Sequence, residues 1–302
     1  MALITTTSFA KAIAPGVNKW FGKSYNEYKT EWDKIFPTYK SKRKYEEDVG
    51  TSSLGLAVQK SEGAAITYDD ERQGFTTRYT HAVYALGFII TREMYEDDLY
   101  AVVGQRKSKA LARSMRQTKE VIGANVLNRA FNSSYLGGDS KELLATDHAN
   151  VAGGTYANEL ATAADISEAA FEQAVIDISL FEDDRGLLIA ARPTKLIIPP
   201  QLMFEAHRIL KSSLRPDQVT NDTNALKDMG MMQDIVVNHY LTDADAWFLK
   251  TDVDDGLKHW ERRADQFEMD NDFDTENAKF KATARFSFGW SDPRGLFGSP
   301  GA

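Results

Sequence analysis

Residues 74–131 read GFTTRYTHAVYALGFIITREMYEDDLYAVVGQRKSKALARSMRQTKEVIGANVLNRAF. Thr76–Ile90 is rich in Thr, Tyr, Val and Ile, which predicts one long strand, and its large residues on both faces place it between two packing surfaces. Thr91 suits an N-cap, and the apolar residues after it recur at helical spacing, so one helix is expected over about Thr91–Phe131. About 40 residues of helix span roughly 60 Å. A rod of this length indicates a shape-defining building block and not a catalytic pocket.

The segment before this strand predicts a projecting ribbon. Two extended segments, Gly55–Lys60 and Ala64–Asp69, flank a turn signal at Ser61-Glu62-Gly63. With Gly74–Ile90 as its second strand, the ribbon leads directly into the long helix.

Residues 1–35 predict an arm that docks on a surface. Its second half carries aromatic residues, and those at positions 21, 25, 28 and 32 follow helical spacing. Aromatic side chains on this scale are costly to leave in water, so they are expected to cover either their own domain or a neighbouring subunit, and the sequence does not choose between the two. The aromatic residues are Trp20, Phe21, Tyr25, Tyr28 and Trp32.

Residues 165–253 predict a mixed α/β unit, because helices and short strands alternate there. A first helix follows the capping-box pattern Asp165-Ile166-Ser167-Glu168, with Asp165 in the cap position, and a later helix is expected over Gln201–Ser212. The expected strands are Leu187–Ala191, Lys195–Ile198, Ile235–Tyr240 and Trp247–Thr251.

The end of the chain returns to strands. Leu257–Arg263 is expected to form one strand. Between Phe280 and Trp290, apolar residues alternate with Lys281, Thr283 and other polar or small residues. This period of two predicts a half-buried strand that packs on the long helix.

The composition disfavours several classes of function. The chain has 302 residues, no cysteine and a formal net charge of -8. It therefore has no disulfide or thiolate metal site, and it is a poor candidate for high-affinity duplex binding, which depends on Lys and Arg. The basic clusters Lys40–Lys44 and Arg106–Arg116 are expected to be solvated faces or subunit contacts. The sequence has neither a signal-peptide pattern nor an apolar run long enough to cross a bilayer, so no membrane partner is expected.

No catalytic, cofactor-binding or metal-ligating residue is predicted, and no cofactor or enzyme activity is expected. None of the five histidines has a metal-binding spacing. The cluster Asp270–Asp274 resembles the start of a calcium loop, but Thr275 and Lys281 stand where that loop needs Gly and Glu. A solvated acidic turn is the favoured interpretation, with a weak cation site as the alternative.

The order of arm, hairpin, long helix, α/β unit and returning strands resembles the major capsid protein of tailed bacteriophages. That family has the Hong Kong 97-like fold, and the resemblance is strongest to its Mu-like major head subunit group. It covers essentially the whole chain, and order and spacing carry it more than any single motif. The segments concerned are Tyr45–Gly50, Arg78–Thr80, Gly87–Thr91, Ser114–Glu120, Asn128–Asn132 and Asn271–Arg294.

The resemblance implies an α+β fold in which the parts have distinct roles. An N-terminal arm reaches over a neighbour, an extended β-hairpin loop lies across the adjacent subunit, and the long helix is the spine of a peripheral domain. A mixed α/β axial domain meets its copies at the centre of each hexamer or pentamer. The expected boundaries are 1–35 for the arm, 36–48 for the start of the peripheral domain, 49–80 for the loop, 81–164 for the peripheral domain with its spine helix, 165–253 for the axial domain and 254–302 for the returning strands.

The resemblance also implies a structural function. Copies of the chain are expected to assemble, in the cytoplasm of a host bacterium, into hexamers and pentamers that form the icosahedral shell of a virion. Further implied partners are a scaffolding protein, a portal, decoration proteins and packaged double-stranded DNA, which is touched without sequence specificity. The residues expected to contact other subunits are Trp20, Phe21, Tyr25, Tyr28, Trp32, Lys60, Glu62, Arg78, Arg113 and Arg116.

One branch of this family joins its subunits by a covalent Lys–Asn cross-link, which a glutamate on the last strand assists. Lys60 lies on the loop, and Asn271 or Asn277 resembles the acceptor. Phe280–Trp290, however, contains no Glu or Asp, so no cross-link is expected.

Two other functions compete with a viral capsid. The first is an encapsulin-like compartment shell that holds an enzyme cargo. Such a shell tends to begin with a helix that lines its interior, whereas this chain begins with an extended, Thr-rich segment. The second is an enzyme that uses the α/β unit at 165–253, but no catalytic motif in the sequence supports it.

Overall fold

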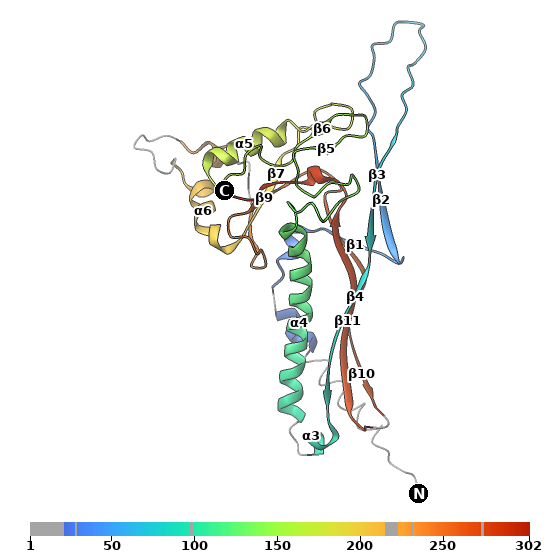
Figure 1. The fold of residues 1–302 in the computed structure, drawn as a ribbon, viewed down its shortest axis with the longest axis vertical. Coiled ribbons are helices and arrows are strands. Elements are labelled where there is room, and N and C mark those ends of the chain that lie inside the picture. The colour runs from blue at the N-terminus through green and yellow to red at the C-terminus, as the bar shows by residue number, and fades with distance from the viewer. Residues whose placement is uncertain are drawn as a thin grey trace.

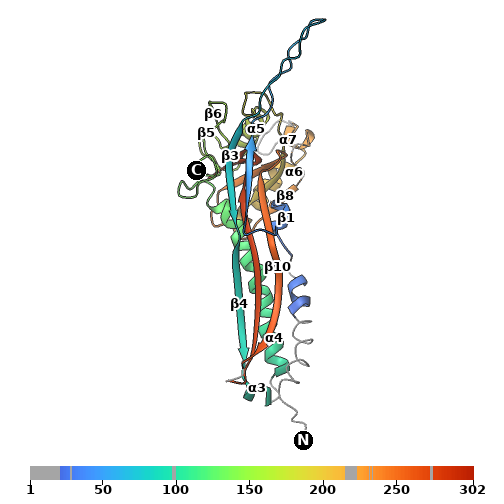
Figure 2. The ribbon, with the colours of Figure 1, turned by 90° about the vertical axis from the view of Figure 1, so that its right-hand side faces the viewer.

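Two four-stranded sheets organise the chain in its computed structural model. The larger sheet is long and narrow, and the smaller one lies at one end of it (Figures 1 and 2). The residues that the structure describes are 21–27, 29–96, 100–214, 223–230, 232, 234–272 and 275–302.

The long sheet has the strand order β1-β10-β11-β4, and α4 runs along it (Figure 1). β11 is antiparallel to both β10 and β4, whereas β1 lies parallel to β10. α3 precedes α4 in the chain. The bounds are Thr38–Lys40 for β1, Ala82–Ile90 for β4, Arg92–Glu96 for α3, Tyr100–Asn128 for α4, Leu257–Asn271 for β10 and Ala278–Trp290 for β11.

β11 confirms the predicted strand that packs on the long helix. Its alternate side chains from Ala282 to Phe286 are buried and pack on Leu111 and Met115 of α4, whereas Lys281 points away and is exposed. Successive side chains of a strand point to opposite faces, so one face can be apolar and the other polar. Fully burying a side chain such as Phe286 contributes about 1.5–3 kcal/mol relative to leaving it exposed.

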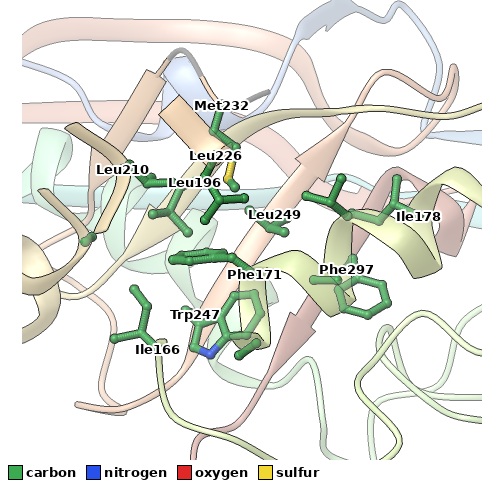
Figure 3. Packing of buried hydrophobic residues seen from close by; sticks show 14 of the residues in the cluster. Ile166, Phe171, Ile178, Leu196, Leu210, Leu226, Met232, Trp247, Leu249 and Phe297 are labelled. Carbon is green, nitrogen blue, oxygen red and sulfur yellow. The ribbon is translucent and has the colours of Figure 1, made fainter. Parts of the chain in front are cut away.

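The smaller sheet, with the order β12-β9-β7-β8, is covered on both faces. One face packs Leu196, Trp247 and Phe297 against Phe171 and Ile178 of α5 (Figure 3). The other face packs on the end of α4 and on α2. The bounds are Trp32–Ile35 for α2, Glu168–Ser179 for α5, Pro193–Ile198 for β7, Pro200–Leu202 for η1, Met203–Lys211 for α6, Ala225–Asp228 for α7, Asp234–Val237 for β8, Trp247–Thr251 for β9, Pro293–Gly295 for η2 and Leu296–Ser299 for β12.

Two hairpins complete the described fold. β2 (Tyr45–Thr51) pairs with β3 (Gln73–Thr80), and β5 (His148–Ala149) pairs with β6 (Thr155–Tyr156). Residues 21–27 are helical, as the aromatic spacing predicts.

The predicted single strand over Thr76–Ile90 is wrong, because the chain changes partners at His81. β3 pairs with β2, whereas β4 pairs with β11 in the long sheet. The His81 ring bonds to Ser41 Oγ and Ser287 Oγ between these two pairings, at 3.1 and 3.0 Å. β4 is also not enclosed between two surfaces in the single chain, because Val83, Leu86 and Ile89 are exposed.

The long helix is shorter than predicted. α4 has 29 residues and ends at Asn128, and α3 covers the start of the predicted helix. Residues 97–99, between α3 and α4, lie outside the described residues. Gly104 and Gly123 lie inside α4 without ending it. A Cβ atom on Gly123 would lie 3.3 Å from both Phe288 and Trp32, so this glycine allows close packing of the helix.

Several smaller predictions need correction. The paired part of the ribbon is β2 with β3, and Gly55–Asp69 forms no strand. Leu187–Ala191 forms no strand, and its one bridge joins Leu188 to Glu182. The N-cap of α5 is Ser167 and not Asp165, since Ser167 Oγ accepts the N–H of Ala170 at 3.2 Å. β8 is shorter than Ile235–Tyr240, and β10 extends well beyond Arg263.

Candidate inter-subunit surfaces

A loop beyond β2 and β3 projects away from both sheets (Figures 1 and 2). Residues 53–72 of this projecting loop are all exposed. Large apolar side chains stand at alternate positions on each limb, with exposed fractions from 59% for Leu54 to 89% for Tyr68. Contiguous exposed apolar surface marks a site of interaction. The side chains concerned are Leu54, Leu56, Val58, Ile66 and Tyr68.

The tip of the projecting loop holds two of the residues expected to contact a neighbour. Lys60 and Glu62 are exposed there. Ala64 N–H donates to Ser61 O at 3.1 Å, and Gly63 has a φ of 78°, which confirms the turn that the sequence predicts. Glycine adopts this left-handed conformation at no steric cost.

Arg78 lies on β3, opposite Glu47 of β2. Its Nε donates to Glu47 Oε1 at 2.7 Å, and its guanidinium lies 4.5 Å from the centre of the Tyr45 ring. The Arg78 side chain nevertheless keeps 59% of its surface exposed. Arg78 therefore stabilises its own hairpin, and the exposed part of its side chain can still contact a neighbouring subunit.

The aromatic arm residues that the structure describes pack mainly inside their own chain. Phe21 is 6% exposed and stacks on Phe267 with ring centres 4.9 Å apart, and Trp32 is 8% exposed. Tyr25 donates its hydroxyl to Asp265 Oδ2 at 2.5 Å, and burial together with this carboxylate raises the Tyr25 pKa. Little of Phe21 and Trp32 is left for a neighbour.

Trp20 and Tyr28 lie outside the described residues.

Charged side chains hold the short helix α2 at both of its ends. Glu120 of α4 accepts the backbone N–H groups of Glu31 and Trp32 at 2.9 and 3.0 Å. At the other end, Lys250 Nζ donates to Ile35 O at 2.6 Å, and Lys195 Nζ donates to the carbonyl of residue 34 at 2.9 Å. A carboxylate at the start of a helix and ammonium groups at its end complement the helix dipole. α2 thereby joins α4 to the smaller sheet.

The two expected contact residues on α4 differ in their surroundings. Arg113 is exposed. Arg116 is half-buried, and its guanidinium lies 4.3 Å from the centre of the Tyr25 ring. Arg113 is therefore the one whose side chain is available at the surface.

Sequence reasoning missed the buried charges where the two sheets meet. Lys258 Nζ lies 2.6 Å from both Asp48 Oδ2 and Asp255 Oδ1. Arg294 is 7% exposed and donates to Asn150 Oδ1 at 2.6 Å and to Asp184 Oδ1 at 3.1 Å. No local pattern could reveal these contacts, because most of the partners lie far apart in the sequence.

A cavity of about 480 Å³ lies at this junction. Its lining includes Asp48, Asp184, Lys258 and Arg294, whose charges pair with one another. In the part of the chain that the structure describes, no group of three or more His, Asp or Glu side chains is placed to hold a metal ion. No helix in that part is both long and apolar enough to cross a membrane.

Residues 74–298 match the family described as phage capsid protein, which is well over half of the chain. The chain belongs to the phage capsid protein family. It is therefore a major capsid protein that forms the shell of a phage head, and it is a structural component of the virion and not an enzyme. This overturns the alternative of an enzyme built on residues 165–253. No curated protein matches the sequence.

Solved structures show which fold the capsid protein has. It is similar to a chain in the procapsid of bacteriophage JBD30, with a TM-score of 0.53 and 13% identity over 98% of this chain and 76% of that chain. It is similar to a chain of Mycobacterium phage Adephagia, with a TM-score of 0.52 and 12% identity over 90% of each chain. A virus-like particle from Pyrococcus furiosus has a TM-score of 0.50 and 10% identity over 94% of this chain and 97% of that chain. The capsid protein thus has the Hong Kong 97-like α+β fold that the sequence predicts.

Proposed function

We propose that the capsid protein forms hexamers and pentamers that close into an icosahedral head around packaged double-stranded DNA. We place it in the Mu-like major head subunit group of tailed phages, on the segment order and the motifs that its sequence shares with that group. Scaffolding, portal and decoration proteins are its further partners in this proposal.

The observation that carries the proposal is the projecting loop. Its five large apolar side chains are exposed in the single chain, and the loop lies away from both sheets (Figure 1). Burying an aliphatic side chain of this size contributes about 1.5–3 kcal/mol. A neighbouring subunit that covered the loop would gain this contribution at every copy of the contact, which favours a closed shell of many equal contacts.

The domain division follows from the same proposal. Residues 36–48, 81–164 and 254–302 would form the peripheral domain around α4 and the long sheet, and 165–253 would form the axial domain around the smaller sheet. Two exposed apolar side chains in 165–253 support contacts from the axial domain as well, since Phe204 and Met229 are 72% and 64% exposed. The arm, 1–35, and the loop, 49–80, would connect neighbouring subunits.

Negative-stain electron microscopy of the chain, expressed alone and with the products of its neighbouring genes, tests the proposal. Uniform hollow shells or rings of five and six subunits are the expected result. A protein that stays monomeric or dimeric under every condition would contradict it.

Paired substitutions in the projecting loop test the observation itself. Leu56→Asp places a charge among the apolar side chains and is expected to abolish shells while the purified subunit stays folded. Gln59→Asp is the matched control, because Gln59 is exposed on the same limb and adds no apolar surface. Equal assembly of both variants would show that the apolar face is not the contact.

The contents of native particles test the packaging of DNA. Double-stranded DNA inside the particles is the expected result, and particles that hold a protein cargo and no DNA would contradict the proposal.

A further inference from the structure

The root of the projecting loop rests on a turn that follows α5. Arg185 Nη1 lies 2.7 Å from Asp69 Oδ2, and Arg185 Nη2 donates to Asp70 O. On the other limb of the loop, the Ser53 hydroxyl donates to Asp183 Oδ2. Both limbs of the loop are therefore bonded to the same short turn, more than 100 residues away in the sequence.

The two limbs are also bonded to each other at this level. Gly55 N–H donates to Asp69 Oδ2 at 2.8 Å, so the Asp69 carboxylate joins its own limb to the opposite one and to Arg185. A Cβ atom on Gly55 would lie 3.2 Å from this carboxylate and 3.4 Å from Arg185 Nη1. The missing side chain at Gly55 thus leaves room for the contact.

The turn is held firmly enough to serve as a support. Asp183 Oδ1 accepts the backbone N–H groups of Arg185 and Leu187 at 2.8 and 2.9 Å. Asp184, the next residue, accepts a bond from the buried Arg294. Hydrogen bonds thereby connect the turn to the interior of the molecule through Arg294, and they connect the loop to the turn through Asp183 and Arg185.

Both carboxylates stay ionised at neutral pH. The Gly55 N–H, followed by Arg185, lowers the pKa of Asp69. Burial acts to raise the pKa of Asp183, but the bonds from Ser53, Leu187 and Arg185 together lower it.

We propose that Asp183 and Arg185 are positioning residues for assembly: they fix the direction in which the projecting loop leaves the subunit, and so which part of a neighbour the apolar side chains meet. This inference rests on the proposed role of the loop as a subunit contact. The ladder of β2 and β3 ends at Thr51 and Gln73, and one further backbone bond joins Ser52 N–H to Arg72 O at 2.8 Å. Backbone pairing therefore does not hold the limbs beyond Ser52 and Arg72.

A small change at the root has a large effect at the tip. From Ser53 to Glu62 an extended chain covers on the order of 25–30 Å. A tilt of about 10° at the root would therefore move the tip by roughly 5 Å, which exceeds the tolerance of a close-packed apolar contact.

Spin-label distances in the full-length free subunit test the positioning directly. The chain has no cysteine, so labels can be placed at Gln59→Cys on the loop and Gln117→Cys on the exposed face of α4 without background. Arg185→Met keeps the stem of the side chain and removes the guanidinium. It is expected to broaden or shift the distance distribution, whereas the control Arg192→Met, at an exposed arginine, is expected to leave it unchanged.

Assembly and stability are measured on the same variants without labels. Arg185→Met is expected to reduce the yield of shells about fivefold or more while the melting temperature changes little, because a single ion pair near the surface adds little to stability. The exchanged pair Asp69→Arg with Arg185→Asp is expected to restore part of the yield. A purely structural role would lower stability and yield together and would give no such rescue.

An unchanged distance distribution in Arg185→Met would overturn the positioning role, and so would normal assembly despite a broadened distribution. Failure of the underlying proposal looks different. In that case Leu56→Asp would assemble normally, whatever the distances in Arg185→Met.

Discussion

Gly256 and Gly295 lie against each other where β10 begins and η2 ends. A Cβ atom on Gly295 would stand 2.4 Å from Gly256 Cα, and one on Gly256 would stand 2.8 Å from Gly295 Cα. Ser291 N–H donates to Gly256 O at 3.1 Å beside this crossing. Two backbones that approach this closely leave no space for a side chain. The contact joins the long sheet to the segment that enters the smaller sheet through β12.

Gly295→Ala is therefore expected to destabilise the subunit by about 1–3 kcal/mol, because the new methyl group meets backbone that cannot move aside alone. Urea unfolding measures the loss. Gly22→Ala is the control, since a Cβ atom there has no neighbour within 4 Å and the residue is helical. That change is expected to be neutral or slightly stabilising. If Gly295→Ala were as stable as the Gly22→Ala control, the backbones of Gly256 and Gly295 would have room for a methyl group, which would contradict the close contact.

Asn158 is fully buried, and its side chain joins three segments of the chain. Its Nδ2 donates to the carbonyls of Leu143 and Pro293 at 2.8 and 2.9 Å, and its Oδ1 accepts Ala145 N–H at 2.9 Å. Asn158→Leu would leave these buried groups without partners, at a cost of about 1–3 kcal/mol for each unsatisfied group. We expect a sharply lower melting temperature and little soluble protein.

The control for Asn158→Leu is Asn26→Leu, which replaces an exposed asparagine. Equal melting temperatures in the two variants would contradict the role of Asn158 as a buried junction.

His259 predicts a dependence of stability on pH. Its ring lies 4.5 Å from the Trp32 ring and 4.4 Å from the Phe288 ring, measured between centres. Burial, and then the nearby Lys119, lowers the His259 pKa to about 3. The unfolded chain binds this proton near pH 6.5, whereas the folded chain resists it down to pH 3. Stability contributed by the neutral ring is thus present above pH 6.5 and falls by up to about 1.4 kcal/mol per pH unit as the pH decreases toward 3.

Replacing His259 by Phe removes this proton-binding group and keeps a ring of similar shape. We expect the free energy of unfolding of His259→Phe to change less between pH 7 and pH 5 than that of the parent protein. His207→Gln is the control, since His207 is exposed on α6. Its free energy of unfolding should change with pH as that of the parent protein does. If the free energy of unfolding changed equally with pH in the parent protein and in His259→Phe, His259 would not be the group responsible.

Mature particles are expected to show no covalent ladder on denaturing gels. The reason is chemical: β11, which covers the segment Phe280–Trp290, offers no carboxylate to assist a bond between Lys60 and an asparagine. Boiled particles should run as a single band at the mass of one subunit. Bands at multiples of that mass, absent from a Lys60→Arg variant, would contradict the expectation.

The sequence predicted best where a local pattern decides the structure. The alternation in Phe280–Trp290 placed β11 and its buried face correctly, because one face of that strand is covered by α4. Trp247–Thr251 was predicted with its observed bounds. The strand over Thr76–Ile90 was predicted as continuous because no Gly or Pro marks the change at His81, where the partners come from opposite ends of the chain.

The candidate surfaces were harder to predict, because contacts between residues far apart in the sequence leave no local pattern. The exposed loop followed from its turn and its extended limbs. Aromatic spacing, in contrast, cannot tell whether Phe21 and Trp32 cover their own chain or a neighbour, and the structure places both in the interior of the subunit. The contact of Arg185 with Asp69 spans 116 residues and has no local signal.

The position of β4 at the edge of the long sheet affects the fate of a subunit before it joins a shell. β4 pairs with β11, and in the described part of the chain no strand covers its other edge. Exposed Val83, Leu86 and Ile89 lie on this strand. An unpaired edge strand with apolar side chains can pair with a strand of another chain. We therefore expect free subunits to aggregate at high concentration. Synthesis faster than incorporation would thus divert chains into insoluble material, and the yield of heads would fall when expression rises beyond the supply of the other head proteins.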